Sequence, residues 1–427
     1  MIKRSFIGLT APKLKCDMVE PDPKDPEAIP IPPRMILLLN EPLDSIRESL
    51  IKQGDRVQKG ERIFLYKDSQ SYVTSPVSGA ITAIAPITGN YGVDATYLVL
   101  ETNTKQDVEQ SFAELAATPN IENADRYLRG IPGDPPLKQL ADPENRFNRI
   151  VITGVDDDLM CTTRQYVLAR FADKIDRAVA LLKQITGIND ISIAMTETMA
   201  KLPVFNGMNL VRVASDYISS LPPMIMAKHL GIPFVPGKDL DVCFIPVEAA
   251  MSLVRAYEEK QSVYDKVITI IDKTGKRTRV TATIGTPIHR IFTRIGVETA
   301  EQDRIIIGGP LRGIAAYTLY HPVMPDMDTL IVQASGESPM ASDYPCINCG
   351  KCVKICPSKV PVNLLVRYLE AGLYQEAADS CDLLSCIDCG LCSYVCTAKI
   401  PIFQYIRLGK HELMKMESEI QTEAQNV

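Results

Sequence analysis

Short apolar runs, separated by turn residues, occupy the chain from Met35 to Glu101. MILLL, RIFLY, SYVTSPVSGAITAIAP and YLVLE are divided by pairs such as Gly54-Asp55 and Ser78-Gly79. Runs of this length, closed by glycine, aspartate or serine, are typical of strands in a small sheet. We therefore predict an all-β module over residues 35–103, preceded by an extended, proline-rich arm over residues 1–34.

Strand patterns alternate with helical patterns further along the chain. RIVIT (149–153) is a β-branched run, a helical pattern continues to about Thr186, and DISIAM, NLVRVAS and DVCFIP repeat the strand signal. Such alternation favours an α/β layer with a largely parallel sheet. We expect this α/β domain over residues 148–260, joined to the β module by a polar, proline-containing linker with one short helix over residues 104–147.

A third pattern begins near Val267. KVITIIDKTGKRTRVTATIG predicts two strands around a turn, TPIHRIFTRIG predicts a helix closed by Gly296, and RIIIGGP predicts another strand. Strand, strand, helix, strand is a β-grasp-like order, which we place at residues 261–312. A connecting segment (313–340), a cysteine-rich region (341–410) and a polar tail (411–427) follow. The chain is thus predicted to be a multidomain α/β and α+β protein.

Composition limits the function classes. The 427 residues carry a net charge of −6, and 46% are hydrophobic and 23% charged. These proportions fit a globular protein and exclude a disordered or fibrous chain. The mild acidity argues against nucleic acid, which binds basic surfaces. No apolar run approaches ~18 residues, and MIKRSFIGLTAPKLKC at the N-terminus lacks the apolar core of a secretory signal. We therefore predict a cytoplasmic protein that reaches the inner face of the cell membrane only through partners.

Eight of the twelve cysteines form an internal repeat at an offset of 40 residues. CINCGKCVKICPSKVPVNLLVR (346–367) aligns with CIDCGLCSYVCTAKIPIFQYIR (386–407), with nine identities. We call the cysteines of these two segments the first and the second comb. Each comb has the C-x2-C-x2-C-x3-C spacing of bacterial two-cluster ferredoxins, in which three cysteines hold one 4Fe–4S cluster and the fourth ligates the other. The spacing predicts cluster 1 on Cys346, Cys349, Cys352 and Cys396, and cluster 2 on Cys386, Cys389, Cys392 and Cys356.

Zinc is the alternative metal for these thiols. Structural zinc usually pairs two distant C-x2-C hooks or combines cysteine with histidine, whereas here a triple comb occurs twice and His411 lies outside it. The second comb has Thr397 where the first has Pro357 of the ferredoxin pattern. This difference changes local hydrogen bonding but removes no ligand. Cys161, Cys243 and Cys381 are predicted to be buried, small apolar side chains.

The order of these parts resembles the C subunit of Rnf-type ferredoxin–NAD oxidoreductases and the related flavin-binding NADH subunit of respiratory complex I. SPVSGAITAI, RVTATIGTPI, IIIGGPLRGIA and both combs carry the resemblance. It implies a barrel-sandwich hybrid at 35–103, a Rossmann-like NADH/FMN-binding domain at 148–260, an SLBB-like β-grasp at 261–312 and a helix-linked dicluster ferredoxin at 341–410. Lys67, in LYKDSQ, lacks the motif of barrel-sandwich carriers, so we expect a purely structural module.

Three segments depart from the family members that bind FMN and NADH, one of them the acidic run TGVDDDLMC (153–161). Their glycine-rich loop, roughly G-x-G-G-A-x-F-P, is replaced by RGIPGDPPLKQL (129–140), where only Gly130 and Gly133 remain as candidate cofactor-binding residues. Proline has no N–H for a phosphate, and Asp134 would repel one. Their Tyr-Pro-x-Gly-x-Glu stretch becomes YISSLP (217–222) and loses its glycine and its acid. We therefore expect weak or no binding of FMN and NAD.

Other candidate sites carry weaker signals. Where the family has an E-C-E-P-type segment, this chain has TGVDDDLMC, whose aspartates 156–158 could hold a divalent cation. We expect a solvated loop there instead. GGPLRG (308–313) matches no phosphate-binding pattern and predicts a tight turn. The four histidines have no metal-ligand spacing, and no Ser/His/Asp or Cys/His catalytic arrangement stands out.

Together these observations predict an iron–sulfur electron-transfer subunit of a multisubunit redox complex, which is not catalytically complete alone. Its partners would be other redox subunits, such as a flavoprotein, a ferredoxin or a membrane-embedded subunit, and the α/β region would be a docking scaffold. Two alternatives stay open. One is a flavin-dependent NADH or ferredoxin oxidoreductase subunit with a diverged FMN loop, and the other is a zinc-binding adaptor.

Overall fold

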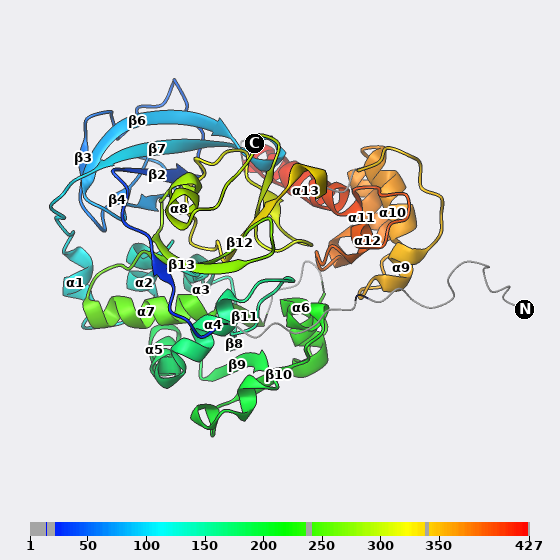
Figure 1. Ribbon diagram of the computed structural model, residues 1–427, viewed down its shortest axis with the longest axis horizontal. Helices are drawn as coiled ribbons and strands as arrows, with labels where there is room; N and C mark the ends of the chain where they lie inside the picture. Colours follow the sequence, from blue (N-terminus) through cyan, green and yellow to red (C-terminus); the bar gives the residue numbers. More distant parts are fainter. Residues whose placement is uncertain (1–13, 15–21, 236–240, 338–340, 426–427) are drawn as a thin grey trace, which may run out of the picture. The chain divides into compact units, whose positions relative to one another are not determined.

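The computed structural model describes residues 14, 22–235, 241–337 and 341–425 (Figure 1). They fall into two compact units, one with residues 22–215 and 241–336 and the other with residues 216–235 and 341–425. The stretch 148–260, predicted as one α/β domain, is thus divided between the two units. Residues 216–235 belong with the cysteine-rich region, a tertiary association that no local pattern encodes.

A four-stranded antiparallel sheet and a separate strand pair form the β module. The sheet order is β2 (Arg34–Leu39), β7 (Asp94–Thr102), β6 (Gly79–Thr88) and β3 (Arg56–Val57), while β4 (Arg62–Ile63) pairs with β5 (Val73–Thr74). Met35 lies opposite Leu100 and Leu37 opposite Leu98, and all four side chains are buried. Lys67 lies in an exposed turn, 3.9 Å from Glu48.

The second sheet is wholly parallel, as the alternating pattern predicts. Its order is β10 (Leu210–Val213), β9 (Asp190–Thr196), β8 (Arg149–Thr153) and β11 (Val242–Pro246). Its helices are α4 (Thr163–Arg170), α5 (Ile175–Thr186) and α7 (Val247–Glu259), which lie beside these strands in Figure 1. Strand residues such as Ile152 and Ile193 share one core with helix residues such as Leu182 and Leu253.

The predicted linker 104–147 is part of that core, and the prediction of a polar connection was wrong. It contains three helices, α1 (Ser111–Leu115), α2 (Ile121–Leu128) and α3 (Leu137–Ala141). Phe112, Leu128 and Ile131 are 3%, 0% and 0% exposed and pack with the α/β helices. The proportion of hydrophobic residues in this segment is lower than the 46% of the whole chain, so its composition hid the burial of those that it has.

A six-stranded sheet completes this unit, in the order β1-β13-β12-β16-β14-β15. β12 (Asp265–Ile271) and β13 (Arg277–Thr283) form the predicted hairpin, and α8 (Ile288–Ile295) ends at Gly296, whose φ is +71°. β14 (Arg304–Ile307) follows. β15 (Ile314–Ala315) and β16 (Thr329–Gln333) lie in the segment predicted to be only a connection, yet β16 pairs with both β12 and β14.

The predicted arm also contributes to this sheet. β1 (Glu27–Ala28) pairs with β13, and Ile29 is buried at 8% exposure. The N-terminal part of the arm, residues 1–13 and 15–21, lies outside the described residues. Residues 313–340 and 27–34 were therefore misjudged for one reason: short strands of two to five residues gain their stability from the sheet they join.

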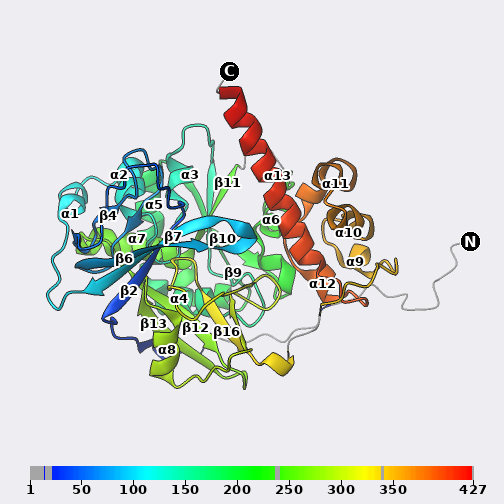
Figure 2. The ribbon, with the colours of Figure 1, turned by 90° about the horizontal axis from the view of Figure 1, so that it is seen from above.

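Helices make up most of the cysteine-rich unit. They are α6 (Pro222–Ile225), α9 (Lys351–Ile355), α10 (Val362–Glu370), α11 (Tyr374–Cys381), α12 (Leu391–Tyr394) and α13 (Ile402–Gln425). Gly372, with φ of +71°, separates α10 from α11. Leu365, Leu383 and Ile406 are among the buried residues of the core. Figure 2 shows α10, α11 and α12 grouped beside the long helix α13.

The predicted polar tail is mostly a continuation of α13, which runs without interruption from the second comb to Gln425. In the described part of the chain, no helix combines the length and the apolar character that crossing a membrane requires. Cys161, Cys243 and Cys381 are buried, at 9%, 3% and 1% exposure, which confirms the prediction that they are core side chains.

Candidate metal centre

The two combs have the same backbone form. Each is a loop that ends in a short helix, with Gly350 before α9 and Gly390 before α12 at φ of 73° and 70°. Two residues earlier, Asn348 and Asp388 also have positive φ, 56° and 52°. Left-handed positions at matched places turn successive backbone N–H groups toward the inside of such a loop. The sequence repeat is therefore also a structural repeat.

Three thiols of the first comb share a cavity with one thiol of the second. Cys346, Cys349 and Cys352 line it together with Cys396, and the remaining walls include Val366, Ile400 and Ile402. Burial, with smaller contributions from the neighbouring thiols Cys346 and Cys349, raises the pKa of Cys352 to about 11. Cys356, the fourth cysteine of the first comb, is not part of this lining.

The second comb shows the converse arrangement. Burial raises the pKa of Cys392 well above its ordinary value, and the neighbouring Cys386 and Cys389 thiols add to the effect. Burial likewise raises the pKa of Cys389, with a further contribution from Cys356. Each set of three thiols thus has the fourth cysteine of the other comb as a neighbour. Thiols with raised pKa values become thiolates when a metal binds them.

Cubane clusters fit these two sets of donors. Among the described residues, no three or more His, Cys, Asp or Glu side chains form a group that could hold a metal ion. A single zinc ion requires sulfurs about 2.3 Å from one point, whereas the thiolates of a 4Fe–4S cluster each bind a different iron. Thiols spread around a cavity with apolar walls suit the second kind of group.

Several polar groups outside the cysteines contact the combs. Thr397 Oγ1 lies 3.5 Å from Cys349 Sγ. Lys410 Nζ donates to the carbonyl oxygen of Cys386 at 2.7 Å and to Asp388 Oδ2 at 2.8 Å. The Tyr217 hydroxyl donates to the carbonyl oxygen of Cys389 at 2.7 Å. Sequence patterns did not reveal the roles of Lys410 and Tyr217, because only the fold brings them to the combs.

The combs differ in exposure. Cys349 is exposed and Ile347 is 66% exposed in the first comb, whereas the equivalent Cys389 and Ile387 are 7% and 8% exposed. The segment with Tyr217 packs on the second comb. YISSLP, which the sequence suggested to be only the remnant of a nucleotide site, therefore contributes to the metal centre.

In the predicted remnant of the FMN loop, backbone N–H groups donate to carbonyl oxygens of the chain itself. The N–H of Gly133 donates to the carbonyl oxygen of Pro325 at 2.8 Å, and that of Asp134 to Ile131 at 2.9 Å. A Cβ at Gly133 would lie 2.3 Å from the backbone nitrogen of Ala249, at the start of α7. Gly130 and Asp134 line a cavity of about 310 Å³ that also contains Asp326. The carboxylates of Asp134 and Asp326 line this cavity, and the N–H groups of Gly133 and Asp134 already have acceptors within the chain.

The acidic run and the GGPLRG turn, predicted as separate features, lie against each other. Asp158 is 8% exposed and accepts hydrogen bonds from the N–H groups of Leu311 at 3.2 Å and Arg312 at 2.6 Å. Burial raises its pKa to about 6, although the N–H groups of Arg312 and Leu159 oppose this. Asp157 pairs with the Arg312 guanidinium at 2.8 Å. The prediction of a solvated acidic loop was therefore wrong.

A buried network of charges continues from this loop. Arg164 pairs with Asp328 at 2.9 Å, Asp328 pairs with Lys266 at 2.6 Å, and Lys266 also pairs with Glu248. Burial disfavours the charge of Lys266, but Asp328 and Glu248 hold its pKa above the ordinary value. These charges satisfy one another, which is the condition for placing them inside a protein.

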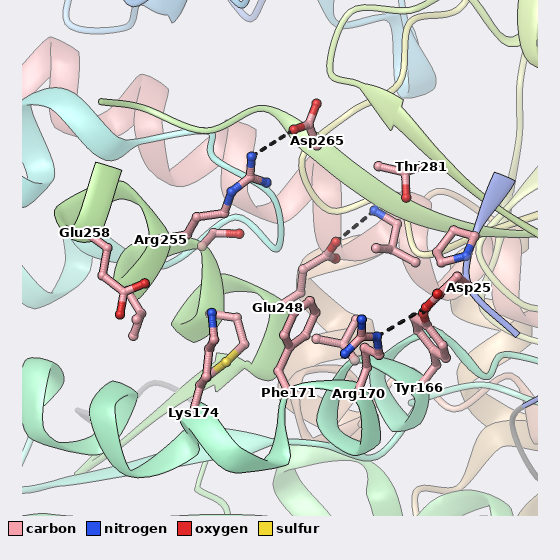
Figure 3. A pocket seen from close by; sticks show the side chains of 16 residues that line it. Asp25, Tyr166, Arg170, Phe171, Lys174, Glu248, Arg255, Glu258, Asp265 and Thr281 are labelled. Carbon is pink, nitrogen blue, oxygen red and sulfur yellow. Dashed lines mark hydrogen bonds and ion pairs between the residues drawn. The ribbon is translucent and has the colours of Figure 1, made fainter. Parts of the chain in front are cut away.

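A further cavity of about 310 Å³ is lined by residues of α4 and α7 (Figure 3). Tyr166, Phe171 and Met251 supply apolar surface. Two ion pairs lie at it, Arg170 with Asp25 at 3.2 Å and Arg255 with Asp265 at 3.1 Å. No motif in the sequence pointed to this cavity.

Comparison with known proteins gives matches at both ends of the chain. Residues 20–105 match the family described as the RnfC barrel sandwich hybrid domain, and residues 339–397 match the 4Fe-4S dicluster domain. A solved structure, the NAD+-reducing [NiFe]-hydrogenase in the air-oxidized state, matches at a TM-score of 0.39 and 12% identity over 62% of this chain and 54% of that chain. That likeness is too weak to support an argument.

Curated relatives cover more of the sequence. Each is the C subunit of an ion-translocating oxidoreductase complex. The protein of Vibrio cholerae serotype O1 is 26% identical over 83% of this chain and 48% of its own length. The protein of Serratia proteamaculans is 25% identical over 77% of this chain and 50% of its own length. The protein of Rhodobacter capsulatus is 24% identical over 82% of this chain and 73% of its own length. The chain spans about half the length of the first two relatives. Over most of its length, it resembles the C subunits of ion-translocating oxidoreductase complexes, with a barrel-sandwich hybrid domain and a 4Fe–4S dicluster domain.

Proposed function

We propose that this chain is an iron–sulfur electron-transfer subunit of a multisubunit ion-translocating oxidoreductase complex. One observation supports this above all: each comb gathers three thiols beside the fourth cysteine of the other comb. The proposal assigns Cys346, Cys349, Cys352 and Cys396 to cluster 1. It assigns Cys386, Cys389, Cys392 and Cys356 to cluster 2. Bound 4Fe–4S clusters supply one-electron transfer.

The remainder of the chain is proposed to be a docking scaffold. In this proposal its parallel sheet would be the Rossmann-like domain and its six-stranded sheet the SLBB-like domain that the resemblance implies, and the latter would extend from β12 to β16. The proposal of a scaffold without FMN or NAD is supported by Gly133, whose N–H already has a partner. Asp158 supports it in the same way, because its carboxylate occupies the N–H groups of the GGPLRG turn.

Partners complete the proposed function. The relatives are subunits of a complex, and an electron that enters a cluster must leave to another redox group. We expect copurification with other redox subunits, at least one of them embedded in the membrane, at whose cytoplasmic face this chain would lie. A chain that is monomeric in extracts and catalyses a complete turnover alone would contradict this.

The test is metal analysis of the full chain purified without oxygen. Two cubanes predict about eight irons and eight sulfides per chain, with broad visible absorption that bleaches on reduction. Stoichiometric zinc with little iron would instead support the zinc adaptor. Flavin extraction, described below, separates the proposed relay from a flavin-dependent oxidoreductase subunit.

A further inference from the structure

Within the proposed metal centre, the two halves of the repeat differ at several positions beside the ligands, and at one of them a side-chain hydroxyl contacts a cysteine sulfur. Thr397 follows Cys396, the cysteine that reaches across to the first comb, and lines the same cavity as Cys346, Cys349 and Cys352. Its Oγ1 lies 3.5 Å from Cys349 Sγ. The equivalent residue of the first comb is Pro357, and proline has neither a hydroxyl nor an N–H to donate.

The direction of this hydrogen bond follows from the chemistry of the thiol. A cysteine that ligates iron is a thiolate without a proton, so Cys349 can only accept and the Thr397 hydroxyl must donate.

Hydrogen bonds to the sulfurs are among the features that set the reduction potential of an iron–sulfur cluster. A donor to a thiolate stabilises the reduced state more than the oxidised state, because the reduced cluster carries one more negative charge. Hydrogen bonds to charged groups are stronger than neutral ones. Thr397 therefore gives the cluster of the first comb a hydrogen-bond donor that Pro357 cannot give to the cluster of the second comb.

We propose that Thr397 is a positioning residue that raises the reduction potential of cluster 1 through its hydrogen bond to Cys349, while cluster 2 has no such donor at Pro357. This inference rests on the proposed function, since it assumes that the first comb and Cys396 hold a 4Fe–4S cluster. It also accounts for the departure of the second comb from the ferredoxin pattern, which occurs at a position that is not a ligand.

The experiment is a redox titration followed by electron paramagnetic resonance, on the full chain purified without oxygen. Thr397→Val keeps the shape of the side chain and removes the donor, and Thr397→Ser keeps the donor. We expect the valine variant to lower the midpoint potential of one cluster. The expected change is about three- to tenfold in the equilibrium constant for reduction, which is roughly 30–59 mV for one electron. The midpoint potential of the other cluster should not change, and both midpoint potentials of the serine variant should equal those of the native chain.

Iron and sulfide analysis of every variant precedes the titration. Full iron with both midpoints unchanged in Thr397→Val would overturn the role of Thr397 and leave the proposed function intact. A serine variant that shifts as far as the valine variant would overturn it as well, because the hydroxyl would then be irrelevant. A native chain without iron would overturn the proposed function together with this inference.

Discussion

The carboxylate of Asp158 accepts a hydrogen bond from the backbone N–H of Arg312, 2.6 Å away and 154 positions later in the sequence. The contact joins the loop after β8 to the glycine-containing turn after β14. At Gly309 there is no room for a side chain, since a Cβ would lie 2.3 Å from the Asp158 side chain. The chain's own carboxylate thus occupies N–H groups that could otherwise hold an anion.

Removing this carboxylate should destabilise the α/β region. Asp158→Ala leaves the N–H groups of Leu311 and Arg312 without their acceptor, at a cost of about 1–3 kcal/mol in the free energy of unfolding. Asp158→Asn retains an acceptor oxygen and should lose less than about half of that amount. Urea unfolding followed by circular dichroism measures both variants. Equal stability of the alanine variant and the native chain would contradict the importance of the contact.

The buried pair Lys266–Glu248 predicts a larger and pH-dependent effect. Lys266 and Glu248 have 0% and 7% exposed side chains, and Asp328 has 16%. Lys266→Met leaves Glu248 without its cation and leaves Asp328 with Arg164 alone, which should cost about 3–5 kcal/mol in the free energy of unfolding at pH 8. Arg177→Met is the matched control, because its pair with Glu258 is exposed, and it should cost at most about 1 kcal/mol.

The sign of the pH dependence follows from the carboxylates. Burial already raises the pKa of Glu248, and Lys266 is the main group that opposes it. Lys266 and Arg164 together hold the pKa of Asp328 below its ordinary value despite burial. Without Lys266, the folded-state pKa of Glu248 rises further above that of the unfolded chain, and the pKa of Asp328, which keeps Arg164, rises as well, so the folded state of the variant binds more protons than the native one as the pH falls. The difference in the free energy of unfolding between the native chain and Lys266→Met should therefore become smaller as the pH falls from 8 to 5. A difference that stays constant would argue against buried charge as its cause.

The sequence predicts those parts of the fold whose signals are local. RIVIT, DISIAM and DVCFIP are β-branched runs, and they became neighbouring strands of a parallel sheet. The linker 104–147 and the strand Thr329–Gln333 were misjudged, because their structure depends on partners that are distant in the sequence. Phe112 becomes a core residue only when α7 supplies Tyr257, whose ring centre is 5.3 Å from its own.

In the candidate metal centre, too, some residues could be predicted from the sequence and others only from the structure. All eight comb cysteines could be identified from spacing, because three thiolates within seven residues are themselves the signal. Tyr217 and Lys410 could not, since each donates a hydrogen bond to a backbone carbonyl of a comb, an acceptor that every residue has, and the ion pair of Lys410 with Asp388 joins residues 22 positions apart. The pairing of Asp158 with the GGPLRG turn likewise requires two loops to meet in space.

The exchange of the fourth cysteine between the combs predicts crossed effects of two substitutions. Cys396 lines the cavity of the first comb, so Cys396→Ala should impair cluster 1 and leave cluster 2 intact. Cys356→Ala should do the converse. Electron paramagnetic resonance of each variant, compared with Cys381→Ala as a control for a buried cysteine outside the combs, measures which signal is lost. If Cys396→Ala removed the signal that Cys389→Ala also removes, the assignment would be wrong.

The last prediction concerns flavin: the full chain, made in a flavin-replete host, should contain no stoichiometric FMN and should not oxidise NADH. A phosphate is held by several converging N–H groups, usually from a glycine-rich turn. Residues 129–140 contain three prolines, which have no N–H, and the N–H groups of Gly133 and Asp134 are used within the fold. The other glycine-containing turn already binds the carboxylate of Asp158.

Acid extraction and fluorescence measure the flavin, with a known FMN protein purified in parallel to show that the cofactor survives the procedure. Less than about one-tenth of an FMN per chain, with iron at the level expected for two clusters, would support an electron relay whose α/β region has become a scaffold. Near-stoichiometric FMN would refute the scaffold and favour the flavin-dependent oxidoreductase subunit. In that case, the phosphate would have to be held by groups other than the N–H groups of Gly133 and Arg312, which already have acceptors.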